Sequence, residues 1–278
     1  MMRIACVQFS PKFMDVEANL ASVEGYVRAA DCDLLVFPEL CLSGYFYTDI
    51  KSATASSQQL ADEPILRLRR IAKECNIAIV IGFLERDGEK LYNSAIAIDR
   101  FGKICGHYRK VHLFYYETQI FSVGDLGFPV CEIEMRTGER LNLGIMICYD
   151  WRFPEAARSL VLGGAEVIAM PANIVTTTGM LLDTLRVRAF ENKVILVFAD
   201  RVGKEFGVVD GVELELVFVG KSAIINFNGE ILASAPESKD TVIVAEVFPE
   251  ATKLKNINNF NNILGDRQYK SYFKDSRE

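Results

Sequence analysis

The sequence predicts an α/β fold in one large domain. Short apolar runs rich in β-branched residues alternate along the 278-residue chain with helical patterns, which is typical of β-sheet covered by helices. The turn sequences at 86–89 (Arg-Asp-Gly-Glu) and 227–230 (Phe-Asn-Gly-Glu) lie between strand patterns, so antiparallel hairpins are expected within the fold. No stretch rich in proline, glycine and serine divides the chain, and its length suffices for one sizeable core.

The expected elements continue this alternation to about residue 248. Strands are predicted where β-branched and other apolar residues run together, and helices where apolar residues recur at the helical spacing. From Pro249 onward the strand pattern is lost and polar residues accumulate, so residues 249–278 are predicted to be a C-terminal extension of a domain spanning residues 1–248. Strands are expected near residues 3–9, 34–37, 77–84, 93–98, 141–147, 167–170, 194–198, 222–226 and 242–247, and helices near 16–30, 64–74, 154–162 and 181–192.

The charge balance disfavours several classes of protein. The chain has 31 basic and 37 acidic residues, and a net charge of −6 argues against a general binder of nucleic acid or of anionic membranes. Its start runs straight into a strand pattern without the apolar region and cleavage site of a secretory signal, and no later stretch is long enough to cross a bilayer. We therefore expect a cytoplasmic protein whose partner is a small molecule.

Cysteine and histidine usage indicates neither disulfides nor a metal site. The seven cysteines are odd in number and include no C-x-x-C pair, so neither a disulfide framework nor a thiolate zinc site is indicated. The two histidines, His107 and His112, are too few and too poorly spaced for an H-E-x-x-H site. We expect reduced thiols and no bound metal or cofactor.

Cys148 ends the apolar run 141–148 and is followed at once by residues that start a helix. A strand-to-helix turn exposes its side chain at the sheet edge and directs free backbone N–H groups toward any oxyanion formed there. The same helix start is expected to favour the thiolate form. A cysteine at this corner is therefore a candidate nucleophile, although a lone cysteine is more often a small buried hydrophobe.

Two further strand patterns end in a charged residue. Glu39 follows the run 33–37 and Pro38, which places its carboxylate at the carboxyl edge of the sheet. Lys110 lies beyond a strand in an apolar and aromatic segment. Read alone, this segment favours a surface lysine with a buried stem, and the alternative for Glu39 is an exposed loop glutamate. Because open α/β sheets collect functional groups beyond the carboxyl ends of their strands, three strand ends that carry a Glu, a Lys and a Cys together indicate a functional site more strongly than any one of them.

The chain resembles the nitrilase superfamily of carbon–nitrogen hydrolases. Segments 37–40 (Phe-Pro-Glu-Leu), 108–113 (Tyr-Arg-Lys-Val-His-Leu) and 148–155 (Cys-Tyr-Asp-Trp-Arg-Phe-Pro-Glu) are similar to the family's Glu, Lys and Cys motifs in order and approximate spacing. The resemblance implies a four-layer α-β-β-α sandwich, which periodicity alone does not distinguish from a single-sheet fold. It further implies that the C-terminal extension packs at a homodimer interface; the alternative is a frayed, solvated tail. Supporting similarity runs through segments 3–9, 170–173, 186–192 and 219–222.

The resemblance also implies roles for individual residues. Cys148 attacks the carbon and forms a thioester, Glu39 is the general base, and Lys110 stabilises the developing negative charge together with the backbone N–H of Tyr149. Glu117 is expected to orient Lys110 and the substrate, because a lysine in a desolvated site requires an anionic partner; the alternative is an ordinary loop carboxylate.

Tyr149, Arg152 and Asn173 are the expected substrate-binding residues. Arg152 is predicted on the first turn of the helix after Cys148, where its guanidinium either pairs with Glu155 or grips a substrate carboxylate, as an arginine at the matching position does in carbamoyl-amino-acid hydrolases of this family.

The substrate class stays open between an aliphatic amide, an N-carbamoyl compound and a nitrile. The Cys motif resembles the amidase branches, whereas segments 199–203 and 220–222 and the Asn-rich tail resemble a group that includes aliphatic nitrilases. Three other classes are less consistent with the chain. A glutaminase domain supplies ammonia to a synthetase, for which this chain has no room. A non-catalytic binding protein does not require all three catalytic residue types. A Rossmann oxidoreductase requires a G-x-G-x-x-G sequence that the chain lacks.

Overall fold

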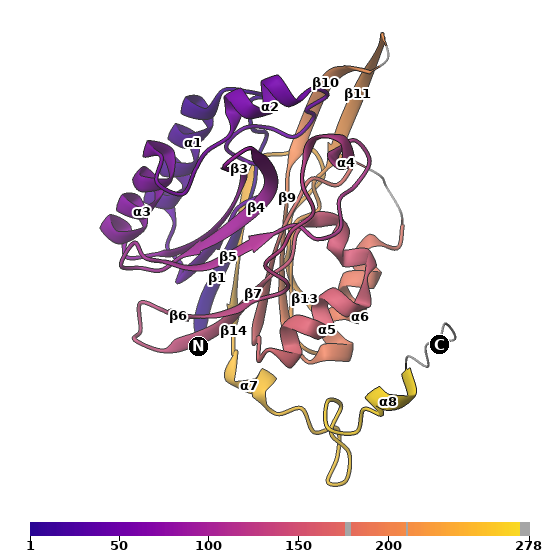
Figure 1. The fold of residues 1–278 in the computed structure, drawn as a ribbon. Coiled ribbons are helices and arrows are strands. Elements are labelled where there is room, and N and C mark those ends of the chain that lie inside the picture. Colours follow the sequence, from indigo (N-terminus) through magenta and orange to yellow (C-terminus); the bar gives the residue numbers. More distant parts are fainter. Residues whose placement is uncertain (176–178, 210, 273–278) are drawn as a thin grey trace.

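Two six-stranded β-sheets pack face to face in the centre of the protein, in a computed structural model that describes residues 1–175, 179–209 and 211–272 (Figure 1). The first sheet has the order β14 (Thr241–Val247), β1 (Met2–Gln8), β2 (Leu34–Val36), β3 (Ala78–Asp87), β4 (Lys90–Ile98) and β5 (Ile104–Arg109). The second has the order β13 (Ile231–Ser234), β12 (Ala223–Ile225), β9 (Ile195–Asp200), β8 (Val167–Ala172), β7 (Arg140–Ile145) and β6 (Val130–Glu134).

Helices cover the outer faces of both sheets, which confirms the predicted four-layer sandwich. Helices α1 (Val16–Ala29) and α3 (Glu63–Cys75) lie on the first sheet, and α5 (Pro154–Leu162) and α6 (Leu181–Asn192) on the second (Figure 1). The bounds of α5 and α6 match the prediction, and α1 ends one residue earlier than predicted. Shorter helices are α2 (Ile50–Ser56), α4 (Glu117–Ile120), α7 (Glu250–Lys253), α8 (Tyr269–Tyr272) and the 3₁₀ helix η1 (Cys148–Arg152).

Strand β1 shows how one apolar run serves two interfaces. Side chains of a strand alternate between the faces of its sheet, so Ile4 and Cys6 join the core between the sheets while Ala5 and Val7 pack under α1 and α3. A strand buried on both faces reads as continuously apolar rather than alternating. This explains why the buried strands of both sheets were identifiable from the sequence.

The carboxyl ends of the central strands lie at the same end of the sandwich. Strands β1, β2 and β3 are parallel to one another, as are β7, β8 and β9, and β5 runs in the direction of β3 because both are antiparallel to β4. The residues that follow β2, β5, β7 and β8 therefore gather where the two sheets meet. This arrangement positions the candidate site.

Both predicted hairpins are present, and several strands were not predicted. Residues 86–89 turn from β3 to β4, and residues 227–230 turn from β12 to β13. The unpredicted strands are β6, β13 and the pair β10 (Val202–Val209) and β11 (Val212–Val219), which forms a separate two-stranded sheet extending beyond the sandwich (Figure 1). Their sequences are short or interrupted by charged residues and glycine, because these strands lie at edges with one face toward solvent.

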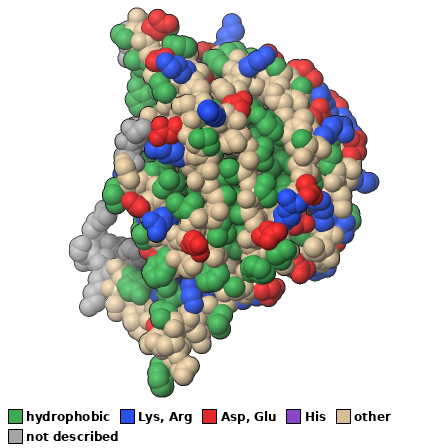
Figure 2. Space-filling model, turned by 180° about the vertical axis from the view of Figure 1, so that it is seen from behind, with side chains coloured by type: hydrophobic (Ala, Val, Ile, Leu, Met, Phe, Trp, Pro, Cys, Tyr) green, Lys and Arg blue, Asp and Glu red, His purple; other side chains and the backbone are tan. Residues whose placement is uncertain are grey.

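Beyond β14 the chain leaves the sandwich through α7 and α8 (Figure 1). Leu254, Ile257 and Phe260 are exposed there, with Phe260 at 93%. That this extension covers a partner stays a prediction. The face shown in Figure 2 mixes basic and acidic side chains with apolar ones between them. In the described part of the chain, no helix is both long and apolar enough to span a bilayer.

Candidate active site

Glu39, Lys110 and Cys148 all lie buried at the converging strand ends. Glu39 is 0% exposed, Lys110 1% and Cys148 4%. The alternative readings of an exposed loop glutamate and a surface lysine are therefore wrong. Buried charged residues require partners, and the contacts of Glu39 and Lys110 show what those partners are.

Close backbone packing holds Glu39 at the end of β2. Gly82 of β3 lies directly beside it, and a Cβ at that glycine would come within 2.7 Å of the Glu39 Cα. The amide of Cys41 donates to the Gly82 carbonyl over 3.1 Å, and the side-chain amide of Asn173 donates to the Glu39 carbonyl over 3.0 Å. Asn173 therefore supports the backbone of Glu39 from the second sheet.

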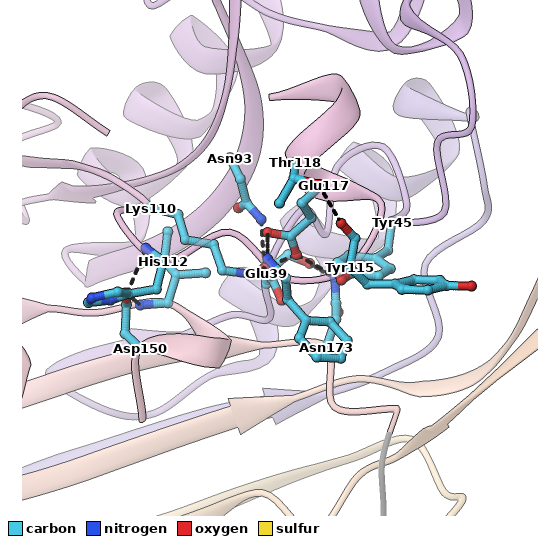
Figure 3. A network of polar contacts seen from close by, with 12 residues as sticks. Glu39, Tyr45, Asn93, Lys110, His112, Tyr115, Glu117, Thr118, Asp150 and Asn173 are labelled. Atoms are coloured by element: carbon cyan, nitrogen blue, oxygen red, sulfur yellow. Dashed lines mark hydrogen bonds and ion pairs between the residues drawn. The ribbon is translucent and has the colours of Figure 1, made fainter. Parts of the chain in front are cut away.

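Lys110 bridges two carboxylates (Figure 3). Its Nζ lies 2.6 Å from Oε1 of Glu39 and 2.7 Å from Oε1 of Glu117. Asn93 on β4 donates to the same Glu39 oxygen over 2.6 Å, whereas the buried Glu39 Oε2 has no hydrogen-bond partner among the described residues. One oxygen of Glu39 is thus fixed by donors while the other is free to accept a proton.

Glu117 is a buried member of this network and not an ordinary loop carboxylate. Besides Lys110, its Oε1 accepts a hydrogen bond from the hydroxyl of Tyr45 over 2.7 Å, and its Oε2 accepts one from the amide of Phe114 over 3.1 Å. Burial raises the pKa of Glu117 to about 7 against the opposing attraction of Lys110. Burial alone would lower the pKa of Lys110, but Glu117 and Glu39 raise it well above its usual range, so the ammonium stays charged.

Cys148 starts the 3₁₀ helix η1 with a left-handed φ of 43°. Strand β7 ends at Ile145, three residues before the thiol. Burial, and after it the charge of Glu39, raise the pKa of the Cys148 thiol well above its usual value. The expectation that the helix start favours thiolate is therefore wrong, because desolvation penalises the charged form more than the short turn stabilises it.

Asp150 holds the turn around Cys148, and sequence reasoning assigned it no role. It is fully buried, and its Oδ2 accepts hydrogen bonds from the amide of Ile147 and the hydroxyl of Tyr108, each over 2.7 Å. Its Oδ1 lies 2.7 Å from Nδ1 of His112. The sequence shows that Asp150 is two residues beyond Cys148 and that His112 is two residues beyond Lys110. It does not show that the two side chains are in contact.

A small pocket opens onto Cys148. Arg152 is the one charged residue in its described lining, which is otherwise aromatic, apolar or amide. The arginine lies at the end of η1 and not, as predicted, in the first turn of the following helix, since Pro154 starts α5 separately. Its guanidinium lies 4.5 Å from the centroid of the Trp151 ring, so in the described part of the chain it packs against that ring and not in the expected pair with Glu155. The other lining residues are Phe114, Tyr149, Trp151, Asn173, Ile174 and Val175.

Tyr45, Asn93 and Asp200 are further buried polar residues near the site that the sequence did not single out. Asp200, at the end of β9, accepts the amide of Ile174 on one oxygen over 2.9 Å, and burial raises the pKa of its carboxyl well above its usual value. No group of three or more His, Cys, Asp or Glu side chains within residues 1–175, 179–209 and 211–272 is arranged to hold a metal ion.

The family model for carbon–nitrogen hydrolases matches residues 3–255. A nitrilase from Pyrococcus abyssi is 38% identical over 99% of this chain and 100% of the relative, and an N-carbamoylputrescine amidase from Solanum tuberosum is 31% identical over 91% of this chain and 88% of the relative. The chain therefore belongs to the carbon–nitrogen hydrolase family, within the nitrilase superfamily. It is a hydrolase.

Solved structures of an amidase from Nesterenkonia show the same fold. A mutant of that amidase superposes with a TM-score of 0.77 at 26% identity, covering 97% of this chain and 95% of the other. In another mutant, with a TM-score of 0.77, 25% identity and coverage of 97% and 98%, acrylamide has added to the active-site cysteine. The two large sheets flanked by helices are thus the fold of this superfamily.

Proposed function

We propose that this protein cleaves a non-peptide carbon–nitrogen bond of a small substrate through a thioester at Cys148 and releases ammonia. The observation that carries the proposal is the buried contact of Lys110 with Glu39 and Glu117 at the strand ends beside a pocket that Cys148 lines. A buried cluster of this kind, with a thiol at a pocket wall, contains a nucleophile, a base and a cation for acyl transfer.

The first half-reaction forms the thioester. Because the resting thiol is protonated, a base must remove its proton as sulfur attacks, and the free Oε2 of Glu39 accepts it. Lys110 and the backbone N–H of Tyr149 stabilise the negative charge on the substrate oxygen, or on nitrogen in a nitrile. Glu39 then returns the proton to the leaving nitrogen, and ammonia or an amine departs as the carbon–nitrogen bond breaks.

The second half-reaction releases the acid. Water gives a proton to Glu39 and attacks the thioester carbon, and the proton returns to the sulfur as the carbon–sulfur bond breaks. For a nitrile, addition of the thiol first gives a thioimidate, which water converts to the same tetrahedral stage before ammonia leaves. Glu117 keeps Lys110 oriented throughout.

The substrate classes we propose are aliphatic amides, N-carbamoyl compounds and nitriles. The relative named as a nitrilase, with its 38% identity over 99% of the chain, supports an aliphatic nitrilase as a second candidate. The Cys motif and the amidases among the structural neighbours support the amide class. We propose Arg152 and Asn173 in the pocket lining, together with Tyr149, as the residues that contact the substrate.

A decisive experiment combines a substrate panel with one variant. Short amides, N-carbamoyl amino acids and dinitriles are assayed for ammonia release, and Cys148→Ala is expected to abolish turnover while the melting temperature stays within a few degrees of wild type. Mass spectrometry with a slow substrate is expected to show an acyl adduct on the peptide that contains Cys148. Turnover retained by Cys148→Ala beyond a trace contradicts the proposal.

We also propose that residues 249–278 form a C-terminal extension that packs at a homodimer interface. The exposed Leu254, Ile257 and Phe260 support this, because isolated tails rarely keep several large apolar side chains in water without a partner. Sedimentation of Phe260→Ser is expected to show a weaker dimer, with Phe101→Ser, an exposed residue in a turn of the main domain, as the matched control. The same dimer dissociation constant in both variants contradicts this role of the extension.

A further inference from the structure

Glu117 depends on Tyr45 as well as on Lys110. The Tyr45 hydroxyl and the Lys110 Nζ each donate to Glu117 Oε1 over 2.7 Å. All three side chains are buried, with Tyr45 at 5% exposure. Burial, and next the charge of Glu117, raise the pKa of Tyr45 well above its usual value, so its phenol keeps the proton that it donates.

The backbone of Tyr45 is fixed by a carboxylate of the β10–β11 hairpin. The carboxylate of Glu205 on β10 accepts hydrogen bonds from the amides of Tyr45 and Phe46 over 3.0 and 2.7 Å. Arg201 pairs with Glu205, and its guanidinium lies 4.0 Å from the centroid of the Phe218 ring. The hairpin β10–β11 therefore supplies a charged cap for the loop that carries Tyr45.

The ring of Tyr45 has little freedom to turn away from Glu117. It meets the Phe218 ring edge to face, with centroids 5.9 Å apart and planes at 88°. Both rings belong to one buried apolar cluster. The direction of the phenol is thus set by packing and by backbone hydrogen bonds before any substrate arrives.

We propose that Tyr45 is a positioning residue of the reaction, whose phenol keeps Glu117 an oriented carboxylate so that Lys110 stays available to the substrate. This role rests on the proposed function. Its physical basis is the balance at Glu117, whose pKa is about 7: burial and the charge of Glu39 raise the pKa of that carboxyl, whereas Lys110 and the hydrogen bond from Tyr45 lower it. Without the phenol, Glu117 takes up a proton at higher pH, and Lys110 loses one of its two anionic partners.

The test compares two tyrosine variants. Tyr45→Phe removes only the hydroxyl that faces Glu117, while Tyr47→Phe is the matched control, because Tyr47 is equally buried in the same cluster but donates to the Ser43 carbonyl over 2.8 Å. We expect Tyr45→Phe to lower kcat about tenfold with KM nearly unchanged, and to move the acid limb of the kcat profile up by about one pH unit. We expect Tyr47→Phe to leave both unchanged.

A titration that does not depend on turnover completes the experiment. The infrared band of a protonated carboxylic acid, assigned to Glu117 by its loss in Glu117→Gln, is followed against pH in wild type and both tyrosine variants. An upward shift of its midpoint in Tyr45→Phe alone supports the proposal, and the same midpoint in all three proteins overturns it. Activity retained by Cys148→Ala refutes the proposed function instead and leaves this titration unaffected.

Discussion

The imidazole Nδ1 of His112 lies 2.7 Å from Oδ1 of Asp150, and this contact joins the segment of Lys110 to the turn of Cys148. His112 is two residues beyond Lys110, and Asp150 is two residues beyond Cys148. The imidazole also stacks on the ring of Phe153 with centroids 3.7 Å apart. The buried carboxylate of Asp150 therefore connects the segment that carries Lys110 with the turn that carries Cys148.

Asp150→Asn is expected to lower both stability and kcat. The carboxamide has one acceptor oxygen where the carboxylate has two, so a buried donor is left without a partner at a cost of about 1–3 kcal/mol in the free energy of unfolding. Chemical denaturation and steady-state kinetics measure the two effects, with Asp183→Asn on the exposed face of α6 as the control. A kcat within twofold of wild type, despite the loss of stability, means that Asp150 does not position the thiol.

Glu39→Gln and Lys110→Ala are each expected to lower kcat by at least about 10²-fold, the scale for loss of a general base or of an oxyanion donor. Glu39→Gln keeps the size and burial of the side chain but cannot take the thiol proton. Glu155→Gln at the exposed start of α5 serves as the control for both. A near-wild-type kcat in either variant shows that the role assigned to that residue is mistaken.

Glu117→Ala is expected to act on the chemical step more than on binding. The substitution removes one of the two carboxylates that contact Lys110. Glu117 is not among the described lining residues of the pocket beside Cys148, so that lining is unchanged. The expected result is a lower kcat with little change in KM. A raised KM at constant kcat would instead place Glu117 among the substrate-binding residues.

Arg152→Ala is expected to separate charged from neutral substrates. If its guanidinium binds a substrate carboxylate, the variant raises KM for carboxylate-bearing substrates by one to two orders of magnitude, about 1.5–3 kcal/mol, and leaves neutral amides and nitriles nearly unchanged. The neutral substrates are the internal control. Equal losses on both classes reduce Arg152 to a support for Trp151, over whose ring it lies.

Glu85→Gln is expected to remove part of the acid sensitivity of the fold. Burial opposes the charge of Glu85, but hydrogen bonds from His107 and Arg109 lower its pKa to about 2 from an ordinary 4.5. Its contribution to stability is therefore present above about pH 4.5 and is lost as the pH falls toward 2. Melting temperatures of wild type and variant are expected to differ at neutral pH and to converge on acidification; a constant difference contradicts this.

The sequence predicted those parts of the protein that depend on local patterns. The fully buried strands were predictable because a strand covered on both faces consists of continuous apolar residues. The helices α5 and α6 were predictable because apolar residues recur in them at the helical spacing. Edge strands such as β6 and the β10–β11 pair were missed because solvent on one face permits charged residues that obscure the pattern. Glu39, Lys110 and Cys148 were identifiable because each follows a strand pattern, and their common setting required the family resemblance.

Only the tertiary structure determined the protonation state of the Cys148 thiol and the hydrogen-bond partners of Glu117 and His112. The helix start at Cys148 predicted a thiolate, but burial beside Glu39 raises the pKa of the thiol and favours the protonated form. This burial results from the packing of the two sheets and not from neighbours in the sequence. Tyr45 and Asp150 carry no motif that marks them as partners of Glu117 and His112. Residues distant in sequence meet only because the strand ends converge, so a hydrogen bond between them is a property of the fold and not of any segment.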